Sequence, residues 1–118
     1  MLRNVLRSKI HRATVRDTHL DYSGSLTIDT ELLEIADIKP YERIEVYNMN
    51  NGERFATYAI EGKRGSGEIC VNGAAARLAQ RGDKIIIATY GMIDDKEIDD
   101  HKARVIILDA NNKVEKIL

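Results

Sequence analysis

Cysteine, tryptophan and aromatic side chains in general are scarce in this sequence. Its 118 residues include one cysteine, Cys70, and no tryptophan, and the aromatic residues amount to 5%. A single cysteine excludes an internal disulfide and a cysteine-based zinc cluster, and it suits a reducing compartment. The shortage of aromatic rings argues against a surface that stacks nucleic-acid bases.

An excess of either charge is also missing. The chain has 18 Lys and Arg residues against 19 Asp and Glu residues, and its formal net charge is −1. A protein dedicated to nucleic acid normally carries a basic excess, so we predict no nucleic-acid partner. The three histidines, His11, His19 and His101, are not spaced like metal ligands, and we predict no metal site.

Long apolar runs are absent as well. The segment Met1–Lys9 interrupts its short apolar runs with charges, and no later stretch reaches the length of a signal-peptide core or a membrane span. We therefore expect a cytoplasmic protein without membrane contact. The length, with 43% hydrophobic and 31% charged residues, predicts one globular domain over residues 1–118.

Turn-forming residues recur at short intervals, with short segments of alternating polarity between them. This pattern is typical of a small barrel or sandwich. The sequences Asn51-Gly52 and Asn111-Asn112 each predict a hairpin. A change of parity near His11 and Arg12 predicts a bulge in the first strand. Strands are expected over 6–15, 26–28, 43–47, 54–60, 68–71, 84–90, 104–109 and 114–118.

Two short helices are expected to interrupt the strands. Asp29 or Thr30 can cap a helix that runs to Ala36, and Pro40 prevents its continuation. A second helix is predicted over Ala74–Gln80. It would be opened by Asn72 or by the glycine after it and would end near the glycine at position 82.

The two helices have the same surroundings. A strand, a short helix, a tight turn and a second strand occupy residues 26–47, and the same order recurs over residues 68–89. A unit that occurs twice predicts a barrel with pseudo-two-fold symmetry, and chance similarity of two common patterns is the alternative. We predict a mainly β fold, a six- to seven-stranded barrel of two interlocked halves with two or three short helices.

Two segments have the composition of ligand loops without the required spacing. Gly62–Gly67 contains three glycines but lacks the Walker pattern, and it predicts a flexible hairpin connection rather than a phosphate-binding loop. The acidic segment Asp94–Asp100 lacks the spacing of a calcium loop, and it predicts a solvated turn or helix.

The tetrapeptide Tyr22-Ser23-Gly24-Ser25 is the strongest candidate for chemistry. By itself it is an ordinary turn. However, the Ser25 hydroxyl lies beside the Gly24 carbonyl carbon, and glycine permits the strained backbone angles that bring the two together. Attack would convert the peptide bond to an ester. Elimination and hydrolysis would then leave a pyruvoyl group at position 25.

Four motifs, in this order, carry a resemblance to a known family. They are Lys9-Ile10-His11-Arg12, Tyr22-Ser23-Gly24-Ser25, Asn51-Gly52-Glu53-Arg54-Phe55-Ala56-Thr57-Tyr58 and Val71-Asn72-Gly73-Ala74-Ala75-Ala76. From about Met1 to about Asp109 the sequence resembles the pyruvoyl-dependent aspartate 1-decarboxylases. The short tail that follows matches weakly.

The resemblance implies a double-psi β-barrel and a homotetramer with sites between subunits. It also implies self-cleavage between Gly24 and Ser25 into residues 1–24 and 25–118, with a maturation factor as one further partner to consider. The expected reaction is decarboxylation of L-aspartate to β-alanine, which supplies pantothenate and coenzyme A synthesis.

The resemblance assigns the main chemical roles to three residues. Ser25 becomes the pyruvoyl group, which forms a Schiff base with the substrate amine and replaces pyridoxal phosphate, and no metal is implied. Tyr58 resembles the family's proton donor. Arg54 would hold a substrate carboxylate in a bidentate pair. Without the resemblance, an exposed arginine and a half-buried tyrosine on one strand face would explain Arg54 and Tyr58 equally well.

Further residues take part in cleavage or substrate binding by the same resemblance. Asn72 would stabilise the oxyanion during self-cleavage, although it is also a candidate helix cap. Thr57 is assigned a part in processing and substrate binding although it points to the opposite strand face from Arg54. Lys9 would add positive charge near a substrate carboxylate.

The remaining assignments concern backbone amides and supporting side chains. The helix start after Asn72 would present backbone N–H groups to the substrate. The residues that form it are Gly73, Ala74 and Ala75, and the two supporting residues near the processing turn are His11 and Tyr22.

A non-catalytic double-psi barrel that serves as a binding module is the alternative interpretation. A denaturing gel discriminates between the two. Two fragments, residues 1–24 and 25–118, indicate the enzyme, whereas a single 13.3 kDa band indicates a binding module or an unprocessed proenzyme.

Overall fold

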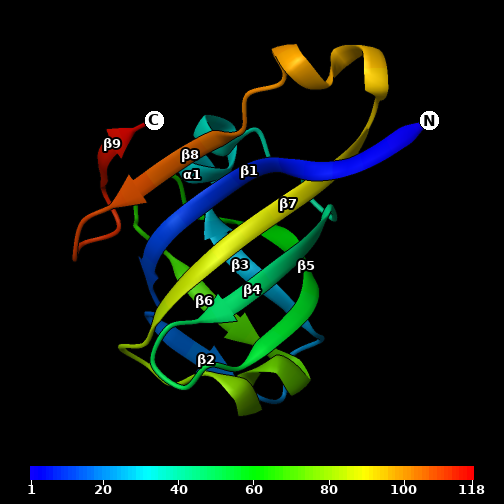
Figure 1. The fold of residues 1–118 in the computed structure, drawn as a ribbon. Helices are drawn as coiled ribbons and strands as arrows, with labels where there is room; N and C mark the ends of the chain where they lie inside the picture. Colours follow the sequence, from blue (N-terminus) through cyan, green and yellow to red (C-terminus); the bar gives the residue numbers. More distant parts are fainter.

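The computed structural model describes residues 1–118, which form nine strands and three short helices (Figure 1). The strands are hydrogen-bonded in the order β2-β6-β3-β5-β4-β7-β1-β8-β9. No helix in the chain is long and apolar enough to cross a membrane. The elements are β1 (Leu2–Thr14), β2 (Asp17–His19), β3 (Ser25–Asp29), α1 (Thr30–Ala36), β4 (Arg43–Asn48), β5 (Arg54–Gly62), β6 (Ile69–Asn72), η1 (Gly73–Leu78), β7 (Lys84–Asp94), η2 (Asp95–Asp100), β8 (Arg104–Leu108) and β9 (Val114–Ile117).

The strand pairing repeats with an approximate two-fold relation. The first half of β5 pairs antiparallel with β4, and its second half pairs parallel with β3. In the other half of the molecule, β1 pairs antiparallel with β7, and β2 pairs parallel with β6. The repeated units β3–α1–β4 and β6–η1–β7 pair with each other through β3–β6 and β4–β7, both antiparallel. The mainly β prediction is confirmed, and this interlocked pairing is consistent with a double-psi barrel.

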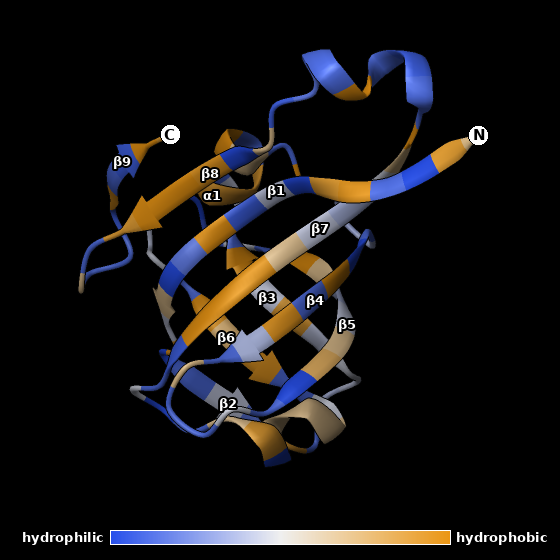
Figure 2. Cartoon of the chain, viewed as in Figure 1, coloured by the Kyte–Doolittle hydropathy of each residue, from blue (hydrophilic) through white to orange (hydrophobic).

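Alternation along the strands places isoleucine, leucine and valine side chains inside. In β4, for example, Ile44 and Val46 are fully buried, and in β7 Ile85 and Ile87 are fully buried. Figure 2 shows these apolar residues along the central strands, whereas the connections and η2 are mostly hydrophilic. Burial of each such side chain contributes roughly 1.5–3 kcal/mol, so the core holds the strands in register.

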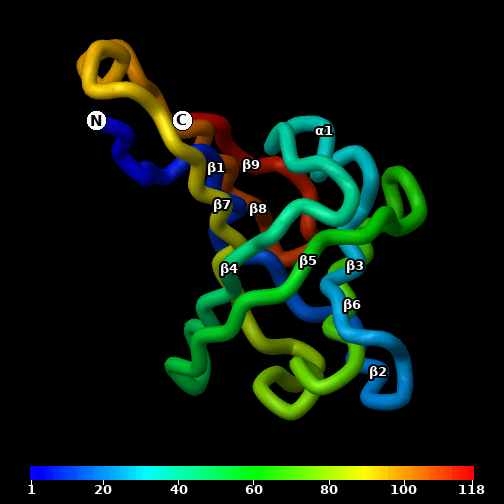
Figure 3. Tube along the Cα trace, turned by 90° about the vertical axis from the view of Figure 1, so that its right-hand side faces the viewer, coloured from blue at the N-terminus to red at the C-terminus, as the bar shows by residue number.

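An arm extends beyond this core. The first residues of β1 pair with the last residues of β7, from Leu2 opposite Asp94 to Leu6 opposite Tyr90, and η2 follows at the tip (Figure 3). The arm makes the molecule elongated, with extents of 44 × 27 × 25 Å. The predicted solvated helix in the acidic segment is confirmed as η2.

Several local predictions are confirmed. The register between β1 and β7 shifts between Ile10 and Ala13, and Arg12 there has a φ of 65°, which is the predicted bulge. Hairpins join β4 to β5 and β8 to β9 at the two expected turns. The three-residue strand β2 was not predicted, because its neighbour β6 is far away in the sequence.

Helix α1 has the predicted bounds, but its end has a different cause. Asp29 caps the start by accepting from the N–H of Glu31 at 2.9 Å. At the other end, Asp37 takes a left-handed conformation, with a φ of 56°, and its N–H reaches the carbonyls of the last turn. The predicted end at Ala36 is confirmed, but the Asp37 cap ends the helix there, and Pro40 lies four residues beyond Ala36.

The second helix differs more from the prediction. It is a 3₁₀ helix over Gly73–Leu78 instead of a helix over Ala74–Gln80, and Ala79 after it is extended. The side chain of Asn72 makes no capping hydrogen bond, because its oxygen, the atom that would accept, faces Cys70 Sγ at 3.4 Å. The predicted cap role of Asn72, and an end near Gly82, were wrong.

The glycine-rich segment 62–67 is not a hairpin connection. Strand β3 lies between β5 and β6, so the segment crosses the end of β3. There the carboxylate of Asp29 accepts the N–H groups of Gly65 and Gly67, each at 2.9 Å. Burial raises the pKa of Asp29, but the three N–H donors, from Gly67, Gly65 and Glu31, outweigh burial and hold that pKa below its ordinary value.

Candidate active site

Ser25 is the first residue of β3 and is paired across the sheet with Asn72, the last residue of β6. Both side chains are buried, with 2% of each residue exposed, whereas Gly24 before the strand is exposed. The Nδ2 atom of Asn72 donates to Ser25 Oγ at 3.0 Å and to Thr27 Oγ1 at 2.9 Å. The antiparallel register therefore places the amide N–H of Asn72 within hydrogen-bond distance of the Ser25 hydroxyl, and the exposed Gly24 precedes that serine.

The glycine that this arrangement requires is Gly73. Its φ is +67°, and a Cβ there would lie 2.6 Å from the Cα of Gly24 and 2.9 Å from the carbonyl oxygen of Tyr22. At Gly24 itself φ lies outside the left-handed region, and a Cβ would meet no atom within 4 Å. The strained backbone predicted at Gly24 is therefore not seen, and the close approach occurs from the η1 side.

A hollow of about 370 Å³ opens beside Ser25, and we call it the Ser25 hollow. Three tyrosine rings line it together with the buried polar pair. The ring of Tyr58 lies 6.3 Å from that of Tyr41, and Tyr22 stacks on His19 at 4.5 Å between ring centres. Its lining residues are Tyr22, Ser23, Ser25, Thr27, Tyr41, Tyr58, Ile60 and Asn72.

A second hollow, of about 350 Å³, opens beside Gly24, and we call it the Gly24 hollow. Thr57 lines it, while the next residue, Tyr58, lines the Ser25 hollow, because successive side chains of β5 point to opposite faces. The peptide bond between Gly24 and Ser25 thus joins residues that line different hollows. The lining residues of the Gly24 hollow are Gly24, Phe55, Ala56, Thr57, Ala74, Ala75 and Leu78.

Four predicted site residues line neither hollow: Gly73, whose backbone lies against Gly24, and three residues with cationic or imidazole side chains. Arg54 is exposed at the start of β5, where its guanidinium lies over the ring of Tyr47, 4.4 Å from the ring centre. Lys9 and His11 lie on β1 on the face opposite the buried Ile10. Within one chain, therefore, these cationic and imidazole side chains are not in either hollow.

His11 has an unusual environment for a polar ring. Its Nδ1 atom is buried and has no hydrogen-bond partner. Burial, and then the positive charges of Lys9 and Arg12, lower the pKa of His11 from its ordinary value. No group of three His, Cys, Asp or Glu side chains in the chain is arranged to hold a metal ion.

Tyr41 lines the Ser25 hollow but was not predicted. It is 78% exposed and has a φ of 70°, a conformation that is costly for a tyrosine. Its N–H donates to the carbonyl of Ala59 at 2.7 Å, and the N–H of Ala59 donates to the carbonyl of Glu42 at 3.0 Å. The turn is thus bonded to β5 beside Tyr58. Sequence patterns do not reveal such a pairing between distant segments.

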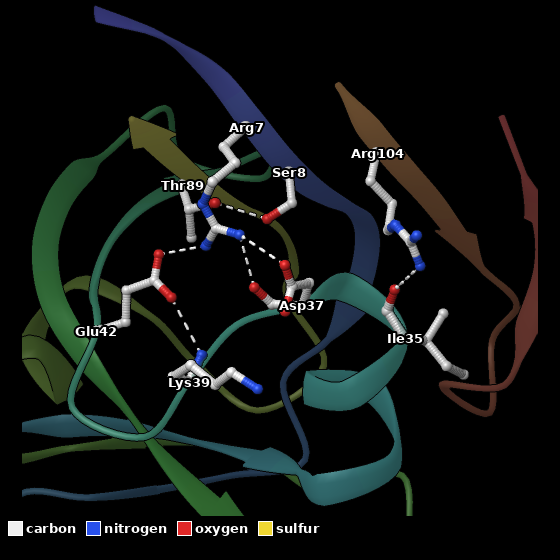
Figure 4. Close-up of polar contacts among 8 residues, drawn as sticks. All are labelled: Arg7, Ser8, Ile35, Asp37, Lys39, Glu42, Thr89 and Arg104. Atoms are coloured by element: carbon white, nitrogen blue, oxygen red, sulfur yellow. Dashed lines mark hydrogen bonds and ion pairs between the residues drawn. The ribbon is translucent and has the colours of Figure 1, made fainter. Parts of the chain in front are cut away.

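Figure 4 shows the contacts between β1 and the turn that contains Tyr41. The guanidinium of Arg7, from β1, donates to the carbonyl of Asp37 at 2.6 Å and forms an ion pair with Glu42. The carboxylate of Glu42 also accepts the N–H of Lys39 at 3.1 Å. An exposed aromatic residue is therefore held at the mouth of the Ser25 hollow by bonds to β1 and β5.

Comparison with known proteins gives a consistent result over the whole chain. A profile of the aspartate decarboxylase family matches residues 1–115. An aspartate 1-decarboxylase of Thermoanaerobacter pseudethanolicus is 59% identical over 113 residues, which cover 96% of this chain and 97% of that protein. The enzyme of the same name from Ralstonia nicotianae is 55% identical over 117 residues, 99% of this chain and 98% of that protein.

The similarity continues beyond Asp109. An aspartate 1-decarboxylase of Desulfotalea psychrophila is 53% identical over 118 residues, which cover all of this chain and 99% of that protein. The chain belongs to the aspartate decarboxylase family. The resemblance inferred from the four motifs is confirmed.

Substitution of Gly73 tests the close approach to Gly24. We expect Gly73→Ala to lower the free energy of unfolding by more than Gly82→Ala does. Both glycines have positive φ, so both alanines are strained by about 1–2 kcal/mol. Only the Cβ at position 73 meets backbone atoms, which adds roughly 1–3 kcal/mol. Urea unfolding measures both variants, and equal losses would contradict the contact.

Proposed function

We propose that this chain is an aspartate 1-decarboxylase, which converts L-aspartate to β-alanine and carbon dioxide after cutting itself between Gly24 and Ser25. The supporting observation is the buried pair of Ser25 and Asn72, with the amide nitrogen 3.0 Å from the hydroxyl, in a chain of the aspartate decarboxylase family. The β-alanine would supply the synthesis of pantothenate and coenzyme A. Because the sole cysteine suits a reducing compartment, we assign the enzyme to the cytoplasm.

Self-cleavage begins at the Ser25 hydroxyl. Its oxygen attacks the carbonyl carbon of Gly24, the C–N bond breaks, and the hydroxyl proton passes to the nitrogen of Ser25, which leaves an ester. Loss of the Ser25 Cα proton and of the Gly24 carboxylate breaks the ester. Uptake of one water and release of one ammonia then leave a pyruvoyl group at the start of residues 25–118.

Two side chains support this step from opposite sides of the peptide. Asn72 already donates to Ser25 Oγ, and we assign its Nδ2 to stabilise the negative charge that develops on the Gly24 carbonyl oxygen. Thr57 lines the Gly24 hollow, so its hydroxyl acts from the Gly24 side. The backbone of Gly73, Ala74 and Ala75 lies beside Gly24 and would also bind the substrate.

The Ser25 hollow fits a pyruvoyl group, because Ser25 lines it with the Asn72 amide and the Tyr58 phenol. Such a group supplies a ketone that takes up the substrate amine and accepts the electrons released as carbon dioxide leaves, without pyridoxal phosphate or metal. We assign the phenol proton of Tyr58 to the substrate carbon that loses the carboxylate. The rings of Tyr22 and Tyr41 would limit the access of water.

A carboxylate clamp is missing from both hollows of a single chain. Arg54, which is exposed, and Lys9, which is partly exposed, line neither hollow. We therefore propose a homotetramer in which Arg54 and Lys9 of one copy face the Ser25 hollow of a neighbour, with His11 in a supporting position. Purified chain that cleaves only after another protein is added would identify a maturation factor as a further partner.

Ser25→Ala tests the central step. The parent should separate into residues 1–24 and 25–118, whereas Ser25→Ala should remain one chain and form no β-alanine, because the attacking hydroxyl is lost. Ser23→Ala, an exposed serine in the same turn, should cleave like the parent. Intact mass and β-alanine formation measure both reactions. Formation of β-alanine by Ser25→Ala would refute the mechanism, and an uncut, inactive parent would favour the binding module.

Tyr58→Phe separates the two reactions. It should cleave normally, since cleavage does not use the phenol, but turnover of aspartate should fall by about two orders of magnitude, within the usual range for a general acid. Tyr22→Phe removes a phenol from the same hollow and should change turnover little. Mass spectrometry reports cleavage, and borohydride trapping reports aspartate bound to the cleaved chain. Normal turnover by Tyr58→Phe would exclude it as the proton donor.

Complementation tests whether the site is shared between copies. Ser25→Ala and Arg54→Ala chains, each inactive alone, should regain about one quarter of the parent activity when co-expressed in equal amounts. Half of the Ser25 hollows then carry serine, and half of those meet an intact Arg54. Ser25→Ala with Tyr58→Phe should show no such recovery, because both residues line one hollow. No recovery with Arg54→Ala would place Arg54 in the same chain as Ser25.

A further inference from the structure

The carboxamide of Asn72 has a buried partner at each end. Its nitrogen faces the hydroxyls of Ser25 and Thr27, and its oxygen, Oδ1, faces the Sγ atom of Cys70 at 3.4 Å. Ser25 and Asn72 are directly opposite in the β3–β6 ladder, as are Thr27 and Cys70, so all four lie on one face. Cys70 is only 4% exposed and forms no disulfide.

We propose that Cys70 is a positioning residue for self-cleavage: its S–H donates to Asn72 Oδ1 and thereby keeps Nδ2 directed at Ser25. The inference rests on the proposed function only in giving Ser25 and Asn72 their roles in cleavage. It assigns a role to the single cysteine of the chain, which the proposed mechanism does not otherwise use.

The two hydroxyls cannot orient the amide by themselves. A hydroxyl both donates and accepts, so Ser25 and Thr27 could bind either end of the carboxamide. The thiol supplies the missing asymmetry, because a protonated thiol donates and its sulfur is a weak acceptor. Burial, and then the charges of Asp17 and Glu68, raise the pKa of Cys70 to about 11, so the thiol keeps its proton at neutral pH.

Loss of the thiol should therefore free the amide to turn. In Cys70→Ala, neither orientation of the amide gives partners to both of its ends, so the amide is no longer held in one orientation. The N–H then faces Ser25 for only part of the time. We expect the rate of cleavage into residues 1–24 and 25–118 to fall by about threefold or more. Cys70→Ser restores a donor, but its hydroxyl can also accept, so its cleavage rate should lie between those of Cys70→Ala and the parent.

A double-mutant cycle distinguishes positioning from packing. If Cys70 acts through Asn72, adding Cys70→Ala to Asn72→Ala should slow cleavage no further. Further slowing in that background, or cleavage of Cys70→Ala at the parent rate, would overturn the inference. Circular dichroism checks that each variant folds, and Cys70→Ser remains informative if Cys70→Ala does not.

The Asn72 side-chain amide signals in nuclear magnetic resonance separate this inference from the proposed function. A parent chain that never cleaves would refute the proposed processing. In either case, the two Nδ2 proton signals should shift in Cys70→Ala, and those of Cys70→Ser should lie between the signals of Cys70→Ala and of the parent. Signals that do not move in Cys70→Ala would refute the positioning role even if the parent cleaves.

Discussion

The register between β3 and β6 is the constraint on which the candidate site depends. It places Ser25 opposite Asn72, and a slip by one residue would move Asn72 to the other face of the sheet. The register is maintained by the opposite face of the same ladder, where Leu26, Ile28, Ile69 and Val71 are fully buried in the core. The hydrophobic core on one face of the ladder thus determines the position of the polar pair on the other face.

The β3–β6 ladder joins the first strands of the two repeated β–helix–β units. In the first unit, Asp29 caps α1 and its carboxylate also holds the glycine-rich crossing between β5 and β6. In the second unit, the corresponding last residue of the strand is Asn72, which donates to Ser25 Oγ, and the next residue, Gly73, has a left-handed backbone that lies against Gly24. The end of the first strand therefore binds the glycine-rich crossing, whereas the end of the corresponding strand in the second unit lies against the candidate cleavage bond.

Sequence reasoning predicted what local patterns determine. Helix α1, the two hairpins and the bulge at Arg12 depend on caps, turn residues and alternation within a few positions. Contacts between distant segments were missed or misjudged: the crossing of 62–67 over β3, the close approach at Gly73 and the entry of Tyr41 into the Ser25 hollow. The resemblance assigned roles to Ser25, Asn72 and Tyr58, which line one hollow in the structure, and those roles stay predictions.

Strand β5 shows how one element can serve two consecutive reactions. Its alternation directs Thr57 to the Gly24 hollow and Tyr58 to the Ser25 hollow. A helix would separate two such neighbours by about 100° and could not direct them to opposite faces. Under the proposed function, Thr57 on one face of β5 assists cleavage, and Tyr58 on the other face protonates the substrate carbon that loses the carboxylate. Because Arg54 extends from the same strand beyond both hollows, β5 also carries the side chain that would bind substrate in a neighbouring copy.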